Sequence, residues 1–146
     1  MELGWGVVIF ALGLLAWGGQ AVTWIAPERA AALSLAESEA SVDAVYWADI
    51  RGEAPWDTFT LWALPLAGVL LLAGHEAWTW LGLFGGGIYL YFGGRGLFTR
   101  LEIRRRGHRI GEPANVRLNL AMCAVWATAW PPTSTPARSS SSNNCP

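Results

Sequence analysis

The chain has 146 residues, of which 53% are hydrophobic and 14% are charged. An average soluble domain has about 45–50% apolar residues with glycine included and about 25% charged residues, so this composition indicates a membrane protein. The ten Trp, the two Cys and ten basic residues that are all Arg exclude a disulfide scaffold, a disordered acidic chain and a basic nucleic-acid binder. The net charge is -1, but the charges are unevenly distributed: acidic residues gather in residues 28–57 and arginines in residues 95–117.

The first apolar stretch, residues 3–26, carries no charged side chain. At about 1.5 Å per helical residue it is longer than a hydrocarbon core of ~30 Å. A secretory signal peptide would begin with positive residues and have a shorter apolar stretch, whereas Met1 and Glu2 stand before this one. We therefore expect a retained transmembrane helix here.

Two further uncharged stretches, residues 58–74 and 77–94, are separated by His75 and Glu76. One continuous helix would place a charge in the middle of the membrane at a cost of roughly 2.5–3.5 kcal/mol. We therefore predict two antiparallel helices with a tight polar turn, a central helical hairpin.

Pro65 lies inside the second of these stretches. A proline removes a backbone donor and clashes with the carbonyl four residues earlier, so it predicts a kink near Leu61 and Trp62. A neighbouring helix can satisfy the carbonyl that the proline frees.

The fourth predicted span covers residues 116–130, and it is short and followed by two prolines. Residues 131–146 are rich in Ser, Thr, Asn and Pro, a composition typical of a disordered polar tail. The predicted fold is thus an all-α membrane domain over residues 1–130 with about four transmembrane helices. Its two cysteines, Cys123 and Cys145, have no CxxC spacing and predict neither a redox motif nor a disulfide.

The arginines set the predicted orientation. Most of them lie in residues 95–117, which the positive-inside rule assigns to the cytoplasm. Acidic residues weigh little in that rule, so the acidic residues 28–57 also belong inside and both termini outside. We expect a multi-pass protein of the cell inner membrane. If the fourth stretch does not insert, three spans remain and the C-terminus is cytoplasmic.

The acidic segment begins with Pro27 and an Ala-rich run, a pattern that favours a cytoplasmic amphipathic helix. One face of this helix would carry the apolar residues Leu35, Val42, Tyr46 and Ile50. Its seven carboxylates have two interpretations, a solvated face or a surface docked on the arginines that follow the third span. We prefer the solvated face, because exposed ion pairs contribute only ~0–1 kcal/mol each.

Five arginines within ten residues follow the third span and suit contact with anionic lipid headgroups, at about 1 kcal/mol each. They are Arg100, Arg104, Arg105, Arg106 and Arg109. A plain topology signal explains them without a dedicated lipid or phosphate site, and we prefer that explanation. The glycines and proline among them predict a turn rather than a long helix. Arg95, at the end of the third span, is expected to reach the interface.

Gly82 and Gly86 in the third span have GxxxG spacing, which allows close approach of two helices. The second span is the default partner, and another copy of the chain or a different membrane protein is the alternative. Most tryptophans lie at span ends, as interfacial belts require. Trp17 and Trp62 lie deeper and are expected to pack between helices.

No metal, haem, phosphate-loop or hydrolase motif occurs in the sequence, so we predict no cofactor and no catalysis. His75 and Glu76 form the only ionisable pair at a span end, and we prefer an interfacial turn to a proton-handling pair. The expected function is a non-enzymatic accessory or scaffolding membrane subunit, in contact with anionic lipids and with a partner. The alternative is an oligomeric transporter or channel component with His75, Glu76 or Gln20 along its path.

Overall fold

The computed structural model describes residues 2–128, and this part of the chain is helical, with one isolated antiparallel bridge between Val42 and Ile110. Trp130 and the predicted tail, residues 131–146, lie outside the described residues. The helices are α1 (Glu2–Ile25), α2 (Pro27–Ala32), η1 (Glu39–Ser41), α3 (Ala44–Thr60), α4 (Ala63–Leu72), α5 (Trp78–Arg105) and α6 (Pro113–Thr128).

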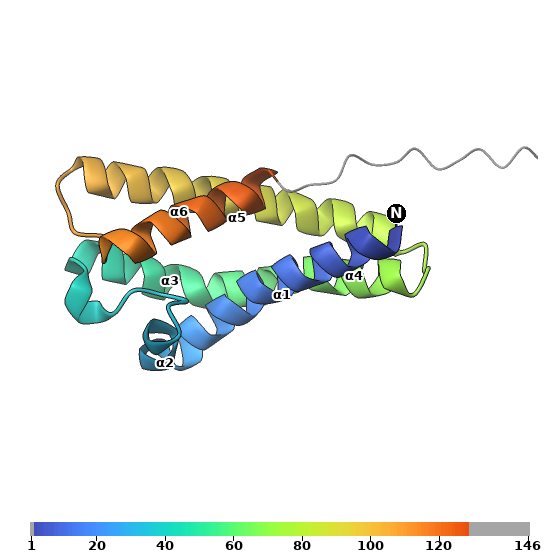
Figure 1. Cartoon of the computed structure of the whole chain (residues 1–146), viewed down its shortest axis with the longest axis horizontal. Helices are drawn as coiled ribbons and strands as arrows, with labels where there is room; N and C mark the ends of the chain where they lie inside the picture. Colours follow the sequence, from blue (N-terminus) through green and yellow to red (C-terminus); the bar gives the residue numbers. More distant parts are fainter. Residues whose placement is uncertain (1, 129–146) are drawn as a thin grey trace, which may run out of the picture.

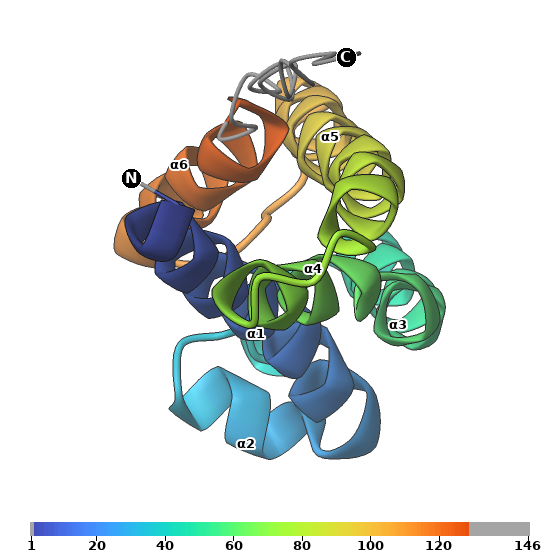
Figure 2. The same ribbon diagram turned by 90° about the vertical axis from the view of Figure 1, so that its right-hand side faces the viewer.

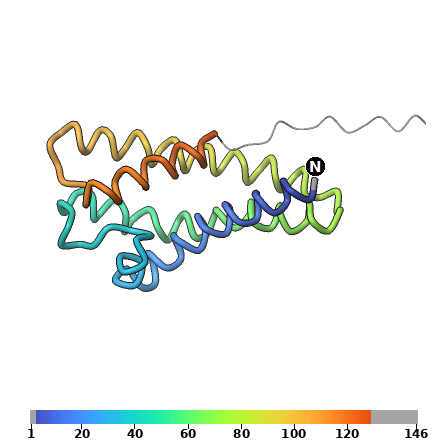
Figure 3. Tube along the Cα trace, viewed as in Figure 1, coloured from blue at the N-terminus to red at the C-terminus, as the bar shows by residue number. Residues whose placement is uncertain are grey.

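The long helices form an antiparallel bundle (Figure 1). The chain runs along the bundle in α1, returns through α3 and α4 in sequence, runs forward again in α5 and returns in α6 (Figure 3). Seen along its length, α1, α4, α5 and α6 surround a common axis, and α2 lies outside against α1 (Figure 2). The first turn of α1 and the turn at residues 73–77 therefore share one end, and the loops at residues 33–43 and 106–112 share the other.

Glycines bring α1 and α4 into direct backbone contact. A Cβ added at Gly13 would stand 2.8 Å from the Cδ and the nitrogen of Pro65, and one added at Gly68 would stand 2.6 Å from the backbone nitrogen of Phe10. Such distances leave no room for a side chain. Small residues at helix crossings are the usual means of packing where water does not drive association.

The kink predicted from Pro65 is confirmed. Helix α3 ends at Thr60 and α4 begins at Ala63, with a turn at Leu61 and Trp62 between them. Proline cannot donate to the carbonyl four residues earlier, which is that of Leu61. The hydroxyl of Tyr89 in α5 lies 3.0 Å from this carbonyl and 2.7 Å from that of Gly13 in α1. One buried tyrosine thus joins three helices at the break.

Some of the glycines of α5 face the neighbouring helices. Gly82 and Gly86, the predicted packing pair, are buried. Gly85 lies against the backbone of Leu64 in α4, and Gly93 against the backbone of Cys123 and Ala127 in α6, where an added Cβ would stand 2.5 Å from the Cys123 oxygen. The interior of the bundle is built from small residues and a few large ones.

Two helical stretches of the described chain are long and apolar enough to cross a membrane, Leu3–Ile25 and Ala44–Leu72. The first agrees with the predicted span over residues 3–26. The second begins much earlier than the predicted residues 58–74, because α3 leads into α4 with only a two-residue break. Helix α6 covers the predicted fourth span up to Thr128, and residues 129–130 lie outside the described part.

Two predictions about the polar segments are wrong. The acidic segment is not one amphipathic helix: α2 ends at Ala32, Ser34 adopts a positive φ of 57°, and a loop precedes α3. The arginine-rich segment is not a turn from its start, because α5 continues to Arg105 before the loop of residues 106–112. Gly107 and Gly111, which predicted a turn, adopt a positive φ in the loop that follows α5, so the turn is present but begins later than expected.

Substituting Gly13 by Ala tests the close contact of α1 with α4. The added methyl group meets Pro65, so we expect Gly13→Ala to lower the free energy of unfolding in detergent micelles by about 1–3 kcal/mol. Gly18→Ala is the matched control, because nothing lies within 4 Å of its added Cβ, and in a helix it should be neutral or stabilising by up to about 1 kcal/mol. Equal stability of the two variants would contradict the contact.

Candidate functional site

The loops at residues 33–43 and 106–112 meet at the arginine-rich end of the bundle, which we call the basic end, and hydrogen bonds join them. We call this set of bonds the clasp. The backbone nitrogen of Asp43 donates to the Arg109 carbonyl at 2.9 Å, beside the bridge of Val42 with Ile110. The Asp43 carboxylate in turn accepts from the Arg109 backbone nitrogen at 3.2 Å and from Arg109 Nε at 3.1 Å. It also lies 3.1 Å from His108 Nδ1. These bonds hold the pKa of Asp43 below its usual range.

Glu37 extends the clasp to the start of α6. Its side chain is buried, and one carboxylate oxygen accepts from the Glu112 backbone nitrogen at 3.4 Å, just before the helix begins at Pro113. Gly111 has a φ of 124°, and a Cβ there would collide with the Glu37 carboxyl group, so only glycine fits. Burial raises the pKa of Glu37. The carboxylate is well placed for the positive end of the α6 dipole.

The structure divides the five arginines predicted to contact lipid. Arg105 and Arg106 bond to Glu102 on their own helix at 2.8 Å, and these bonds lower the pKa of Glu102 to about 2. Arg109 belongs to the clasp. Arg104 borders a cavity of about 410 Å³ at the basic end. The other charged or ionisable residues around this cavity are His108, Arg109 and Arg117.

Arg100 differs from the others because it points into the bundle. Its Nε donates to the Tyr46 hydroxyl at 3.0 Å, its guanidinium lies 5.9 Å from the centre of the Tyr46 ring, and its Nη1 lies 3.5 Å from Cys123 Sγ. These contacts link α5 to α3 and α6. Arg100 is thereby held away from a lipid headgroup at the surface.

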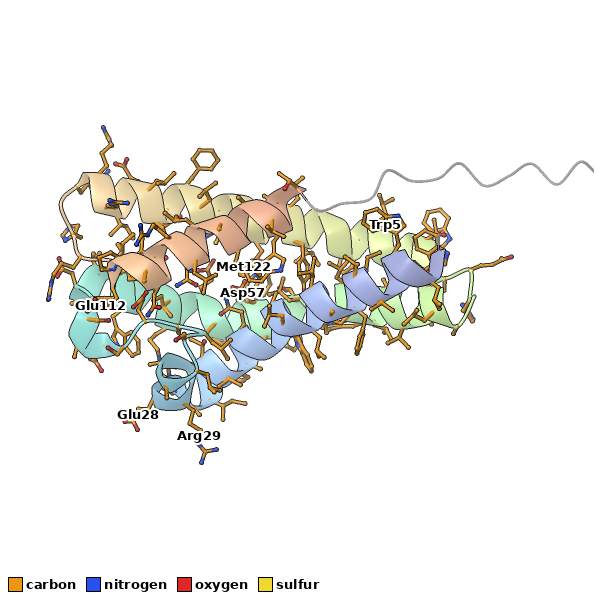
Figure 4. The ribbon with its side chains drawn as sticks, viewed as in Figure 1. Trp5, Glu28, Arg29, Asp57, Glu112 and Met122 are labelled. Atoms are coloured by element: carbon orange, nitrogen blue, oxygen red, sulfur yellow. The ribbon has the colours of Figure 1, made fainter. Side chains whose placement is uncertain are left out.

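The acidic segment is both docked and solvated. Asp43 docks on Arg109 and His108, the arrangement that we considered second to a solvated face. Glu28 and Glu39 are exposed, and Figure 4 shows Glu28 and Arg29 pointing away from the bundle. Docking on the arginine cluster is therefore made by Asp43, whereas Asp49 and Glu53 pair with Arg95.

A second polar group lies deeper in the bundle, and sequence reasoning missed it. Asp49, Glu53 and Asp57 follow one another at four-residue spacing and therefore share one face of α3. Arg95 of α5 bonds to Glu53 and, at 3.0 Å, to Asp49. Arg95 thus pairs with two carboxylates of α3 and stays 33% exposed, and its position at the interface stays a prediction. The four-residue spacing was the signal that would have found this group.

Asp57 is the member of this group without a partner. Its side chain is 6% exposed, and its Oδ2 has no hydrogen-bond partner. It lies midway along the bundle, between Glu112 at one end and Trp5 at the other (Figure 4). With Asp49, Glu53 and Arg95 it borders a cavity of about 370 Å³ between α3 and α5.

The turn residues His75 and Glu76 are exposed. His75 Nδ1 accepts from the Ala77 backbone nitrogen at 3.1 Å, a contact that belongs to the turn. Gln20 is half-buried in α1. Trp17 packs between helices as predicted and donates to the Thr58 carbonyl at 2.9 Å, whereas Trp62 is 44% exposed.

Within residues 2–128, no group of three His, Cys, Asp or Glu side chains is arranged to hold a metal ion. In comparisons with known proteins, no family model, curated protein or solved structure matched the chain.

Replacing Asp43 by Ala tests the clasp. We expect backbone amides of residues 108–112 to exchange hydrogen several-fold faster at pH 7 in Asp43→Ala than in the wild type, and Glu39→Ala to exchange like the wild type. Folding lowers the pKa of Asp43. The stabilisation that its carboxylate gives to the clasp is therefore fully present at a pH above the ordinary pKa of Asp, and it is lost as the pH falls through the lowered pKa of the folded state. Wild-type exchange, corrected for intrinsic rates, should therefore approach that of Asp43→Ala in acid. Unchanged protection in Asp43→Ala would rule the clasp out.

Proposed function

We propose that this chain is a multi-pass protein of the inner membrane whose four helical columns, α1, α3 with α4, α5 and α6, cross the bilayer. In this proposal it acts as a non-enzymatic accessory or scaffolding subunit. Both termini lie outside, and the clasp and the arginine-rich end lie in the cytoplasm.

The distribution of large apolar side chains supports the membrane location. They are exposed over much of the surface of the bundle, where a water-soluble protein rarely shows large apolar patches. The interior combines glycines and alanines with a few large apolar side chains such as Leu61 and Phe92. Phe59, Trp80 and Phe98 are 77%, 78% and 71% exposed. Others that are exposed lie on α1, α4, α5 and α6: Leu3, Val7, Leu14, Leu15, Leu66, Val69, Leu83, Phe84, Leu90, Leu118 and Val125.

The charges support the orientation and the lipid contacts. Arg104, Arg109 and Arg117 border one cavity at the end that holds most of the loop arginines, and arginine-rich loops favour the cytoplasmic side. Three guanidinium groups around one cavity suit the phosphate of an anionic lipid headgroup, and each basic side chain near such a surface contributes about 1 kcal/mol.

The outward face of α5 carries the proposed accessory role. Trp80, Gly87 and Gly94 follow one another at seven-residue spacing. Seven residues turn an α-helix through two turns less about 20°, so these three residues lie on nearly the same face of α5. Nothing lies within 4 Å of a Cβ added at either glycine. A second row, Phe84, Tyr91 and Phe98, runs beside them and is exposed. Open glycines bordered by large rings fit the backbone of another transmembrane helix.

A second candidate function is an oligomeric small transporter or channel component. The buried, unpartnered carboxylate of Asp57 favours it, because ionisable residues inside membrane domains commonly mark substrate or ion pathways. The exposed turn at His75 and Glu76 does not contribute to such a path.

Native mass spectrometry of the gently extracted protein, with Gly87→Leu/Gly94→Leu compared to wild type, tests the accessory role. We expect wild type to carry a different membrane protein and the double variant to lose it by roughly tenfold or more, since two leucines fill the space for a partner helix. The variant should unfold like wild type, because its new side chains enter open space. Gly18→Leu, also in open space, should keep the partner.

Retention of the partner by the double variant would show that the α5 face is not the interface. Assembly of wild type only with its own copies would favour the transporter or channel component over the accessory subunit.

A further inference from the structure

We propose that the cavity bordered by Asp57 binds a small organic monocation, an amine or quaternary ammonium whose charge lies against the Asp57 carboxylate and whose carbon groups lie on the surrounding aromatic rings. This proposal does not rest on the accessory role, although Tyr91 borders both the cavity and the outward face of α5.

The charges around the cavity leave Asp57 uncompensated. Three carboxylates, Asp49, Glu53 and Asp57, face one guanidinium, that of Arg95, and both bonds of Arg95 go to Glu53 and Asp49. A surplus of negative charge therefore remains in the cavity. A buried carboxylate requires a compensating partner or a proton.

Among residues 2–128, the neighbouring polar groups are engaged elsewhere. Arg100, the next guanidinium along α5, is held by the Tyr46 hydroxyl and lies beside the Cys123 sulfur. The Tyr89 hydroxyl is directed to the carbonyls of Gly13 and Leu61. Oδ2 of Asp57, 94% of whose side chain is buried, has no hydrogen-bond partner. Asp57 borders the cavity, and its carboxylate is the group beside which the cation binds.

The walls of the cavity favour a cation with carbon substituents. Trp56 and Tyr91 border its mouth and are 66% and 67% exposed, and Phe92 is buried in its wall. Aromatic faces attract ammonium groups, and several rings together are the usual recognition device for quaternary ammonium. Ala48 and Gly52 also border the cavity, and their small side chains leave its volume open.

The size and the donor set favour an organic cation over a divalent metal ion. The volume of about 370 Å³ falls within the range of about 300–1,000 Å³ of small-molecule sites. Divalent metal ions require several oxygen ligands, whereas Arg95 already occupies two of the three carboxylates and residues 2–128 contain no metal-binding cluster. One free carboxylate with aromatic rings matches a monovalent organic cation.

Isothermal titration of the full chain in neutral detergent with tetraethylammonium and with methylammonium tests the site. We expect saturable binding of one cation per chain, and roughly tenfold or greater weakening by Asp57→Asn, because the ion pair is lost. Glu76→Gln, on the exposed turn, is the charge-matched control and should bind like wild type. Circular dichroism melting shows whether Asp57→Asn is folded.

Trp56→Leu separates the ring contribution from the charge. This exposed side chain can be replaced without disturbing the fold, and we expect the affinity for tetraethylammonium to fall several-fold more than that for methylammonium. Absence of saturable binding to wild type, or equal binding by Asp57→Asn, would overturn the proposal. So would proton uptake by Asp57, followed by its infrared carboxyl band, without any cation binding.

Discussion

The break at Leu61 and Trp62 determines how the bundle is built. Pro65 packs on Gly13 of α1 and leaves the Leu61 carbonyl without its helical donor. An unpaired carbonyl in an apolar interior costs about 1–3 kcal/mol. The Tyr89 hydroxyl, within hydrogen-bond distance of this carbonyl and of the Gly13 carbonyl, brings α5 against both α4 and α1. The crossing of these three helices therefore follows from one missing backbone donor.

The need of buried polar groups for hydrogen-bond or charge partners also governs α3, which carries most of the polar side chains of the interior. Arg51 donates to the carbonyls of Thr23 and Trp24 and so caps the C-terminal end of α1. Arg95 is paired by two α3 carboxylates, and Arg100 by Tyr46 of α3. In the core of a bilayer no water is present to hydrogen-bond such groups, so side chains of α3 supply hydrogen bonds and charge partners to the neighbouring helices. Asp57 alone on this face is left without one.

The sequence predicts the helical class, the first span, the kink and the buried glycines Gly82 and Gly86, because apolar length, proline chemistry and residue size act locally. The start of the second span and the length of α5 were missed. Charged residues bounded both predicted spans, yet Arg95 pairs with Asp49 and Glu53 across two helices. Pairing between residues more than forty positions apart is invisible to a local pattern. Docking of the acidic segment on the arginines was the less favoured interpretation, because exposed ion pairs contribute little. The bonds of Asp43 with the Arg109 backbone depend on how two loops meet, which a local pattern does not predict.

The central claim, that the bundle lies across a bilayer with its arginine-rich end in the cytoplasm, is tested most directly by labelling single cysteines in intact cells with an impermeant thiol reagent. In a background with Cys123 and Cys145 replaced, Ser41→Cys and Glu112→Cys should react only after the membrane is opened. His75→Cys and Glu2→Cys should react from outside. Labelling of Glu112→Cys from outside, or of His75→Cys only after opening, would contradict the account.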